Sequence, residues 1–358
     1  MTDVLEAARR GDEVAFERLV GPYRRELHAH CYRMLGSLHD TEDAMQEAML
    51  RVWRGLDGFR DRQSLRAWLY RIATNASLDL IGRRKRRQLP FDYAPAADPQ
   101  QPPGAPVAEA AWIEPYPDEA LGIEDVHASP DARYEQREAL ELAFVAALQH
   151  LPPRQRAVLI LREVLGFSAK EVGETLETSV PSVNSALQRA RQTVDERMPE
   201  RSQQMTLRSL GDARMREIVE EYMEAMSRGE VNRVVSMLTE DAAWSMPPLA
   251  SWYRGHDELE VFLRNGPLSG EWRWRHLPAG ANGQLASAAY CWLEEEGAHI
   301  PFALDVIALE GEKIAEITAF VVRRADTPDG YARWPRFAAD PERVESVFRR
   351  FGLPDRLD

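Results

Sequence analysis

The sequence predicts a multidomain protein in which two all-α helical domains, the second with a helix-turn-helix, precede an α+β domain. Apolar residues recur at helical spacing as far as about residue 198, and residues 92–136 interrupt them with eight prolines and ten acidic side chains. Strand-like runs begin only near residue 286. At roughly 150 residues per domain, a chain of 358 residues suits two or three domains.

Composition and termini exclude several classes of protein. Hydrophobic residues at 44% and charged residues at 29% are typical of globular chains. No apolar run approaches the roughly 18 residues of a membrane span, and the first residues are charged from Asp3 onward, unlike a secretory signal. Cys31 and Cys291 lie far apart and match no metal-ligand spacing. We therefore expect a cytoplasmic protein that needs neither a disulfide, a metal nor a cofactor.

Charge is distributed unevenly along the chain. The net charge of the whole chain is −13, yet residues 1–91 carry 17 basic and 13 acidic side chains. Residues 92–136 carry 1 basic and 10 acidic side chains, and residues 202–358 carry 18 and 26. This asymmetry predicts that the N-terminal part meets a polyanion.

Residues 3–91 are predicted to form the first helical domain. One helix should cover Thr41–Leu56, with Asp40 or Thr41 as its cap, and a second should run from Ser64 to about Arg86. The apolar positions of the first helix share one face, which we expect to be core: Met45, Met49, Val52, Trp53 and Leu56.

Residues 92–136 have the composition of an extended linker. Its 45 residues could span on the order of 150 Å when extended. The motif WIEPYPD is too aromatic for a pure spacer, so we expect it to dock on a folded domain, although a stray apolar patch is the alternative. The expected contact residues are Trp112, Glu114, Pro115, Tyr116, Pro117 and Asp118.

Residues 137–200 are predicted to form the second helical domain. A short helix at Ser168–Leu176, a turn, and a helix from Ser179 to about Arg197 make a helix-turn-helix pattern. The last helix places Val183, Leu187, Ala190 and Val194 on an inner face. Its outer face is polar, as base reading requires, although a bundle with a polar surface is the alternative. The candidate readers are Ser182, Asn184, Ser185, Gln188 and Arg189.

Residues 59–87 form a strongly basic block. They hold nine basic and two acidic side chains, interleaved with the aromatic residues Phe59, Trp68 and Tyr70. Cations follow phosphates and aromatic rings stack on unpaired bases, so this block predicts binding to single-stranded DNA. The alternative is a solvated helix end with core aromatics, and Trp68 is the residue for which we weigh that alternative most heavily.

These motifs resemble the extracytoplasmic-function sigma factors of the sigma-70 family. DTEDAMQEAMLRVW, at residues 40–53, resembles region 2.2, which docks on RNA polymerase core, and the 59–87 block resembles regions 2.3 and 2.4, which melt and read the −10 element. Residues 151–191, from LPPRQRAVL to ALQRAR, resemble region 4, which reads the −35 element. The resemblance implies a promoter-specificity subunit that performs no chemistry itself.

The resemblance also assigns residues by position. The polymerase-binding face would be Asp40, Glu42, Asp43, Gln46 and Glu47. Contacts to the −10 element would come from Phe59, Arg60, Arg62, Ser64, Trp68, Arg71, Asn75, Arg83, Arg84, Lys85 and Arg86. Contacts to the −35 element would come from Ser182, Asn184, Ser185, Gln188, Arg189 and Arg191. Asn184 stands where many members have arginine, which predicts an altered −35 preference, because asparagine pairs with adenine.

Residues 210–323 are predicted to form an α+β domain, followed by a tail at 324–358 with a helix near Pro341–Phe351. Helical spacing covers Arg214–Ser227 and about Val231–Leu238, and strands are expected at Ala286–Leu293, Ile300–Leu309 and Lys313–Val322. The segment resembles SnoaL-like domains of the nuclear-transport-factor-2-like superfamily, and the whole chain resembles the sigma G-type subgroup that carries one. We expect this cone-shaped domain to regulate the sigma factor, with a small apolar ligand as a possible partner.

Two rival functions stay open on the sequence alone. The cone could be an isomerase or cyclase fused to a DNA-binding module, with Asp241, His276 and Asp305 as its titratable candidates. Fold analogy does not transfer catalysis, so we expect no enzyme. The chain could also be a helix-turn-helix repressor of duplex DNA. The 59–87 block argues against a repressor, which has no use for a single-strand platform. The expected partners are RNA polymerase core and promoter DNA, with no membrane.

Overall fold

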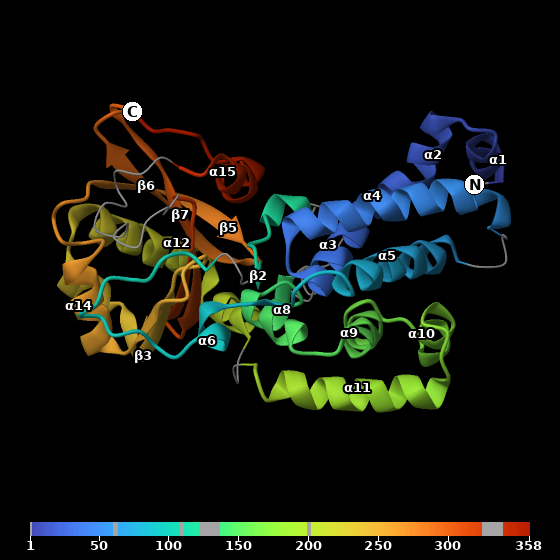
Figure 1. Ribbon diagram of the computed structural model, residues 1–358, viewed down its shortest axis with the longest axis horizontal. Coiled ribbons are helices and arrows are strands. Elements are labelled where there is room, and N and C mark those ends of the chain that lie inside the picture. The colour runs from blue at the N-terminus through green and yellow to red at the C-terminus, as the bar shows by residue number, and fades with distance from the viewer. Residues whose placement is uncertain (1, 60–63, 108–110, 122–136, 199–201, 324–338) are drawn as a thin grey trace. The chain divides into compact units, whose positions relative to one another are not determined.

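The structure is a computed structural model, and it describes residues 2–59, 64–107, 111–121, 137–198, 202–323 and 339–358 (Figure 1). The chain divides into two compact units. The first unit is made of Met1–Arg87 and Ala120–Met198, and the second of Gln88–Glu119 and Pro199–Asp358. The chain therefore passes from one unit to the other three times. Within the described residues, no helix is both long enough and apolar enough to cross a membrane.

The first unit begins with a helical module at residues 2–87, which we call the first module. Its helices are α1 (Thr2–Arg9), α2 (Glu13–Val20), α3 (Arg24–Leu35), α4 (Leu38–Gly55) and α5 (Leu65–Ile81). Gly36 ends α3 with a φ of 67°, the left-handed conformation that glycine adopts most readily. The next residue, Ser37, starts α4 by accepting a hydrogen bond from the Asp40 amide at 3.1 Å. The cap is therefore Ser37, and the prediction of Asp40 or Thr41 is wrong.

Residues 137–198 form the second module of the first unit. Its helices are α8 (Leu142–Gln149), α9 (Pro153–Leu159), α10 (Ala169–Thr175) and α11 (Val180–Asp195), with a π-helical turn at Ile160–Val164. Pro152 separates α8 from α9, and Pro153 is the first residue of α9. Proline suits this position because the amide groups of the first helical turn have no hydrogen-bond partner within the helix. Buried apolar residues from both modules share one hydrophobic cluster.

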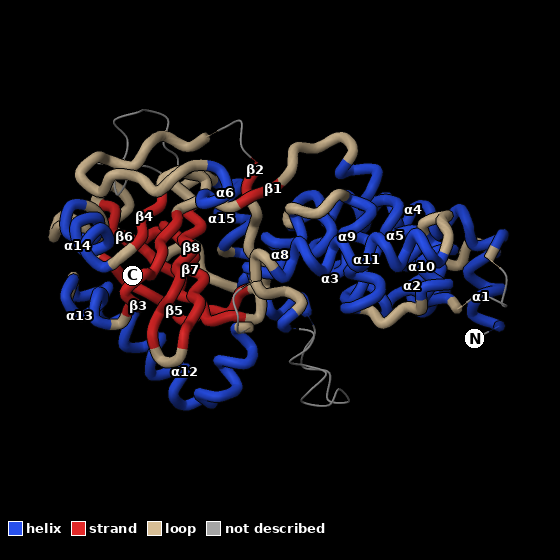
Figure 2. The backbone as a smooth tube through the Cα atoms, turned by 90° about the horizontal axis from the view of Figure 1, so that it is seen from below, coloured by secondary structure: helices blue, strands red, loops and turns tan. Residues whose placement is uncertain are grey.

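The second unit is built on a six-stranded sheet in the order β4-β3-β8-β7-β6-β5 (Figure 2). The strands are β3 (Leu238–Ser245), β4 (Trp252–Arg254), β5 (Trp274–Ala281), β6 (Gln284–Leu293), β7 (Ala298–Glu310) and β8 (Lys313–Val321). Strands β5 to β8 form an antiparallel meander, whereas β3 pairs with β8 in parallel. The last three strands lie close to their predicted ranges, and the other three were not predicted.

Helices of the second unit complete its core. They are α12 (Gln203–Arg228), α13 (Val231–Ser236), α14 (His256–Asn265) and α15 (Pro341–Val347). Helix α12 contacts β5, β6 and β7, and α14 contacts β3. Side chains from α12 and α14, such as Tyr222 and Phe262, share a buried cluster with Trp244 of β3. The predicted fold class, two helical domains followed by an α+β domain, is confirmed.

Part of the expected linker is folded against the sheet domain. Residues 88–119, which we call the docked segment, belong to the second unit and include the short helix α6 (Pro90–Tyr93) and strand β2 (Ala111–Trp112). The Trp252 indole donates a hydrogen bond to the Ala94 carbonyl at 2.8 Å, and the Val107 amide donates to the Pro248 carbonyl at 3.1 Å. The acidic, proline-rich composition therefore does not make this stretch a free spacer.

Candidate nucleic-acid and polymerase interface

Helix α4 presents a polar face to solvent. Glu42 and Gln46 are exposed, and the side chains of Asp43 and Glu47 are about half-buried, 40% and 46% exposed. The face continues into two large apolar side chains, Leu50 at 43% and Trp53 at 37% exposure. Trp53 was predicted to be core, and that prediction is wrong. The exposure of Leu50 could have been predicted, because Leu50 follows Glu42 and Gln46 at intervals of four residues and so shares their helix face.

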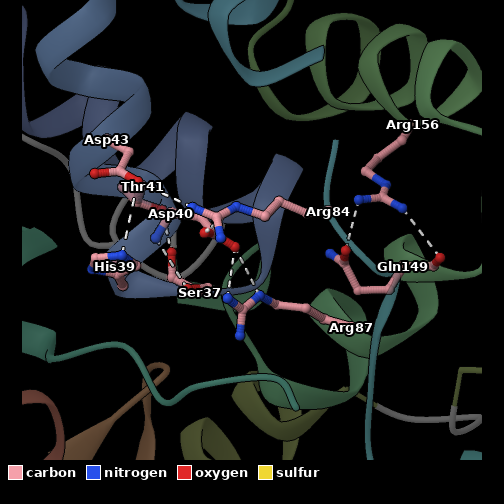
Figure 3. A network of polar contacts seen from close by, with 9 residues as sticks. All are labelled: Ser37, His39, Asp40, Thr41, Asp43, Arg84, Arg87, Gln149 and Arg156. Carbon is pink, nitrogen blue, oxygen red and sulfur yellow. Dashed lines mark hydrogen bonds and ion pairs between the residues drawn. The ribbon is translucent and has the colours of Figure 1, made fainter. Parts of the chain in front are cut away.

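Asp40 does not belong to this exposed face. Its residue is 3% exposed, and the Arg87 guanidinium donates two hydrogen bonds to its Oδ2 atom at 2.6 and 3.0 Å (Figure 3). Arg84 lies 3.6 Å from Oδ1 in a second ion pair. A carboxylate buried with an arginine partner holds the start of α4 against the residues that follow α5. The expectation that Asp40 belongs to the exposed polar face of this helix is therefore wrong.

The aromatic residues of the basic block are mostly core. Phe59 and Trp68 are 5% and 7% exposed, and their rings pack on each other with centroids 4.9 Å apart. Neither ring offers a free face for a base in this structure. Trp68 is therefore a core residue, which is the alternative weighed for it above, and Phe59 is a core residue as well. Ser64 and Asn75 are exposed on α5, and Arg71 is half-buried. Arg60 and Arg62 lie outside the described residues.

The cationic end of the block remains on the surface. Arg83, Arg84, Lys85 and Arg86 follow the end of α5 at Gly82 and are all exposed. Arg84 is 3.5 Å from Asp43 in addition to its contact with Asp40. Helix α5 is thus followed by a run of cations suited to phosphates, and Arg84 of this run also pairs with carboxylates of α4.

The helix-turn-helix is fixed by local chemistry. Ser168 and Glu171 form a reciprocal capping box at the start of α10, and Ser179 accepts a hydrogen bond from the Ser182 amide at the start of α11. Gly173 lets the turn close, because a Cβ atom there would lie 2.9 Å from the Thr178 carbonyl oxygen. The predicted inner residues of α11 are buried: Val183, Leu187, Ala190 and Val194.

The outer face of α11 is polar beyond the exposed Val180 at the start of the helix. All six predicted −35 contacts are exposed: Ser182, Asn184, Ser185, Gln188, Arg189 and Arg191. Arg191 forms an ion pair with Glu163 at 2.8 Å. Of the other predicted −35 contacts, those with the longer side chains are Asn184, Gln188 and Arg189. A helix that shows amides and a guanidinium to solvent has the groups needed to read base edges in a major groove.

The two modules pack directly on each other. Phe167, which precedes α10, lies edge-on to Tyr70 of α5 with ring centroids 5.4 Å apart. Arg66 of α5 lies 5.0 Å above both rings, and its guanidinium also reaches Glu26 at 3.3 Å. The helix expected to read the −10 element is therefore in contact with the module expected to read the −35 element.

A buried arginine ties the modules together at a second point. Arg156 of α9 is 3% exposed and donates to the Met34 carbonyl at the end of α3 and to the Gln149 side chain at 2.6 Å. From the other side, Arg33 donates to the Ala139 carbonyl at 2.9 Å. Hydrogen bonds to charged donors stabilise by about 1.5–3 kcal/mol each, so these contacts are a substantial part of the junction.

The WIEPYPD motif lies on the sheet of the second unit. Tyr116 is fully buried and exchanges two hydrogen bonds with Asn282, at 2.8 and 2.9 Å, in the turn between β5 and β6. Asp118 accepts a hydrogen bond from the Gly283 amide at 2.7 Å. Gly280 is needed here, because a Cβ atom at that position would lie 2.7 Å from Asp118 Oδ2. Of the other motif residues, Trp112, Pro115 and Pro117 are buried and Glu114 is half-buried.

A small cavity of about 30 Å³ lies inside the second unit between α12, α14 and the sheet, and Asp305 lines it together with His276 and several aromatic rings. Asp305 is 3% exposed and accepts a hydrogen bond from the Tyr222 hydroxyl at 2.9 Å. Burial raises the pKa of this carboxyl to about 7 and lowers that of His276 to about 3. Asp241, the third titratable candidate, is exposed beside Arg254. The cavity has room for about two water molecules.

Three family profiles match the chain in order. The profile described as Sigma-70 region 2 matches residues 19–87, the one described as Sigma-70, region 4 matches 141–194, and that of the SnoaL-like domain matches 219–317. The first two fall in the first unit and the third in the second unit.

Comparisons with individual proteins and structures agree with the family profiles. The chain is 39% identical over 353 residues to the ECF RNA polymerase sigma factor SigG of Mycobacterium tuberculosis, covering 98% of this chain and 86% of that one. It is 30% identical to the sigma factor SigW of Bacillus subtilis over 53% of this chain and 92% of that one. The crystal structure of the M. tuberculosis sigma factor SigJ shares the fold with a TM-score of 0.55 at 22% identity, covering 93% of this chain and 98% of that one. With its two sigma-70 regions and its fused SnoaL-like domain, the chain belongs to the extracytoplasmic-function sigma factors of the sigma-70 family, in the sigma G-type group predicted from its sequence.

Proposed function

We propose that the second module of this sigma factor reads the −35 element through Asn184, Gln188 and Arg189, while Arg83, Lys85 and Arg86 hold duplex phosphates near the −10 element. The observation that carries this proposal is the exposed polar face of α11 above a buried apolar one. The protein then acts in the cytoplasm as the promoter-binding subunit of RNA polymerase, docked on core through the outward face of α4. Leu50 and Trp53 extend that docking face, since exposed aromatic and aliphatic side chains are common anchors of protein interfaces.

Asn184→Arg tests the assignment of α11. Asparagine pairs with adenine and arginine with guanine, and each good pair is worth about 1–3 kcal/mol of discrimination. We expect the variant to prefer promoters with guanine at one −35 position by roughly tenfold over adenine, while the wild type prefers adenine. The measurement is promoter-specific transcription by sigma-free polymerase core supplied with either protein, on templates that differ at single −35 positions. The proposal would be wrong if both proteins ranked the templates alike.

We also propose that the free protein is closed and inactive. Two promoter elements two helical turns apart are separated by about 70 Å, whereas α5 and Phe167 are in contact. Both modules cannot hold their elements while they share this contact, so opening must accompany promoter binding. The second unit contributes to control, because the chain that joins the modules is held on its sheet through Tyr116 and Asp118.

Phe167→Ala should open the first unit. Removing a buried phenylalanine costs about 3–5 kcal/mol, and here part of that loss falls on the contact with Tyr70 and Arg66. We expect a larger radius of gyration by small-angle X-ray scattering and a higher transcript yield at limiting protein. Gly280→Ala, which displaces Asp118, should act in the same direction through the docked segment.

Phe16→Ala is the matched control, because Phe16 is also 8% exposed but packs against Trp53 within the first module. It should leave the radius of gyration unchanged. If Phe167→Ala retains a folded circular dichroism spectrum and the wild-type dimensions, the closed form does not depend on this contact and the proposal fails.

The cavity around Asp305 favours a regulatory role over catalysis for the cone domain. Substrate pockets usually measure about 300–1,000 Å³, roughly ten times the cavity seen here, although a neutral carboxyl beside an uncharged imidazole would suit a small uncharged ligand. We therefore propose that the domain is not an enzyme and that any ligand is small and largely apolar. Turnover of a ketosteroid-type substrate that Asp305→Asn abolishes would contradict this.

A further inference from the structure

A basic hollow lies at the junction of the two modules of the first unit. It has a volume of about 370 Å³ and is lined on one side by residues after α5, from Arg84 to Arg87, and on the other by residues of α8, α9 and the turn between them, from Gln149 to Arg156. Figure 3 shows the two sides, with Arg84 and Arg87 directed at Asp40 and with Arg156 beside Gln149. Its size falls within the range of small-molecule sites, which is about 300–1,000 Å³.

The lining carries an excess of positive charge. Five cationic side chains line the hollow and Asp40 is the only carboxylate among its described lining residues, which gives a net charge of +4. Asp40 interacts with Arg87 and Arg84, and Arg84 also pairs with Asp43 outside the hollow. A concave surface of one charge sign concentrates ions of the opposite sign.

Arg156 shows that this charge is not balanced inside the junction. Its guanidinium donates hydrogen bonds to uncharged oxygens of Met34, Gln149 and Leu151, and its buried Nε atom has no hydrogen-bond partner among the described residues. Burial, with a further contribution from the positive charge of Arg86, lowers the pKa of Arg156 to about 10. Two arginines that repel each other across a hollow are the arrangement that a bound anion would stabilise.

We propose that this hollow binds an oligophosphate small molecule of nucleotide size, and that the bound anion holds the two modules together. Guanidinium groups match phosphate oxygens in paired hydrogen bonds, and a chain of phosphates supplies the several negative charges that a site of charge +4 requires. A single carboxylate or phosphate would leave most of that charge uncompensated.

The site exists only while the modules are in contact, because each contributes one wall. A ligand that touches both walls binds the closed form more tightly than the open form, so it shifts the population toward the closed form. The same Lys85 and Arg86 are our proposed contacts to promoter phosphates, so oligophosphate and promoter DNA compete for them. The whole proposal thus rests on the closed form proposed above.

Inorganic tripolyphosphate is the probe, titrated into the full-length protein by isothermal titration calorimetry at low ionic strength. We expect one saturable site. Arg86→Ala should weaken binding by about tenfold, because one charge-assisted contact is lost. Arg83→Ala is the matched control: it removes the same charge three residues earlier, from an exposed residue that does not line the hollow, and should change the affinity by less than about twofold because of screening.

Equal losses in the two variants, or titration without saturation, would overturn the site, because either result means diffuse attraction to a basic surface. Hydrogen exchange tests the two walls: tripolyphosphate should slow exchange both at residues 84–87 and at residues 149–156. Protection of the first stretch alone would place the anion on the first module only and overturn the link to closure.

A third experiment uses a short DNA duplex that contains no promoter. If it binds at Arg86 but tripolyphosphate does not displace it, the hollow is a DNA surface and the proposal is wrong. Promoter binding by the protein with sigma-free core, measured before any nucleotide or other phosphate compound is added, separates a failure of this site from a failure of the proposed promoter function.

Discussion

Asp305→Asn is expected to stabilise the protein at pH 8 more than at pH 5. Burial raises the pKa of Asp305 to about 7, against a usual value of 3.8, so the folded state holds a proton that the unfolded chain releases at lower pH. Stability is therefore lost as the pH rises from about 4 to 7, by a total of roughly 4 kcal/mol once the carboxyl is ionised. Asparagine cannot ionise, and its carbonyl oxygen can still accept the hydrogen bond of Tyr222.

The measurement is urea unfolding of both proteins across this pH range. The advantage of the variant should grow by roughly 2–3 kcal/mol between pH 5 and pH 8, since about half of the loss is already present at pH 5. Asp241→Asn is the control, because it makes the same substitution at a side chain that is 76% exposed. An advantage of Asp305→Asn that does not vary with pH would show that this carboxyl is already ionised at pH 5.

Reversing the charges of Asp43 and Glu47 is expected to abolish binding to polymerase core. Both carboxylates lie on the outward face of α4 beside Glu42 and Gln46. Bringing two lysines against a surface that accepts carboxylates adds like-charge repulsion of several kcal/mol, which corresponds to a loss of affinity of about 100-fold or more. The fold should survive, because exposed ion pairs such as Glu47 with Arg51 contribute little to stability.

Co-purification with core polymerase measures the effect, and circular dichroism checks the fold. Glu6→Lys combined with Glu13→Lys reverses the same number of charges on α1 and α2 and should leave co-purification intact. Wild-type recovery of core by the Asp43→Lys, Glu47→Lys protein would remove this face from the interface.

The helices of the first unit could be predicted because local signals specify them. Serine caps and the periodic apolar residues of α11 act over a few residues, and the prediction of the helix-turn-helix rested on that periodicity. Strands β3 and β5 were missed because their side chains do not alternate in a simple way. In β5, partly buried residues such as His276 and Leu277 follow one another.

The errors within the candidate site have a common cause. Asp40 and Trp53 both lie on α4, where periodicity gives a face but not its surroundings. Asp40 is buried because Arg87 reaches it from 47 residues further along the chain, and Trp53 is exposed although it follows the apolar stripe. Contacts between distant segments decide both cases, and a single sequence does not contain them. The hollow between the modules was missed for the same reason.

The docked segment changes how much promoter spacing this sigma factor can accommodate. While residues 88–119 stay on the sheet, their span is fixed, and 22 residues of chain separate Glu119 from the start of α8 at Leu142. That stretch reaches at most about 75 Å, roughly half of what the whole linker would span. Each added base pair moves one promoter element by about 3.4 Å and turns it by about 35° around the helix axis. We therefore expect the docked linker to restrict the lengths of promoter spacer that the sigma factor accepts. Release of Tyr116 and Asp118 from the sheet would then widen the set of promoters that it recognises.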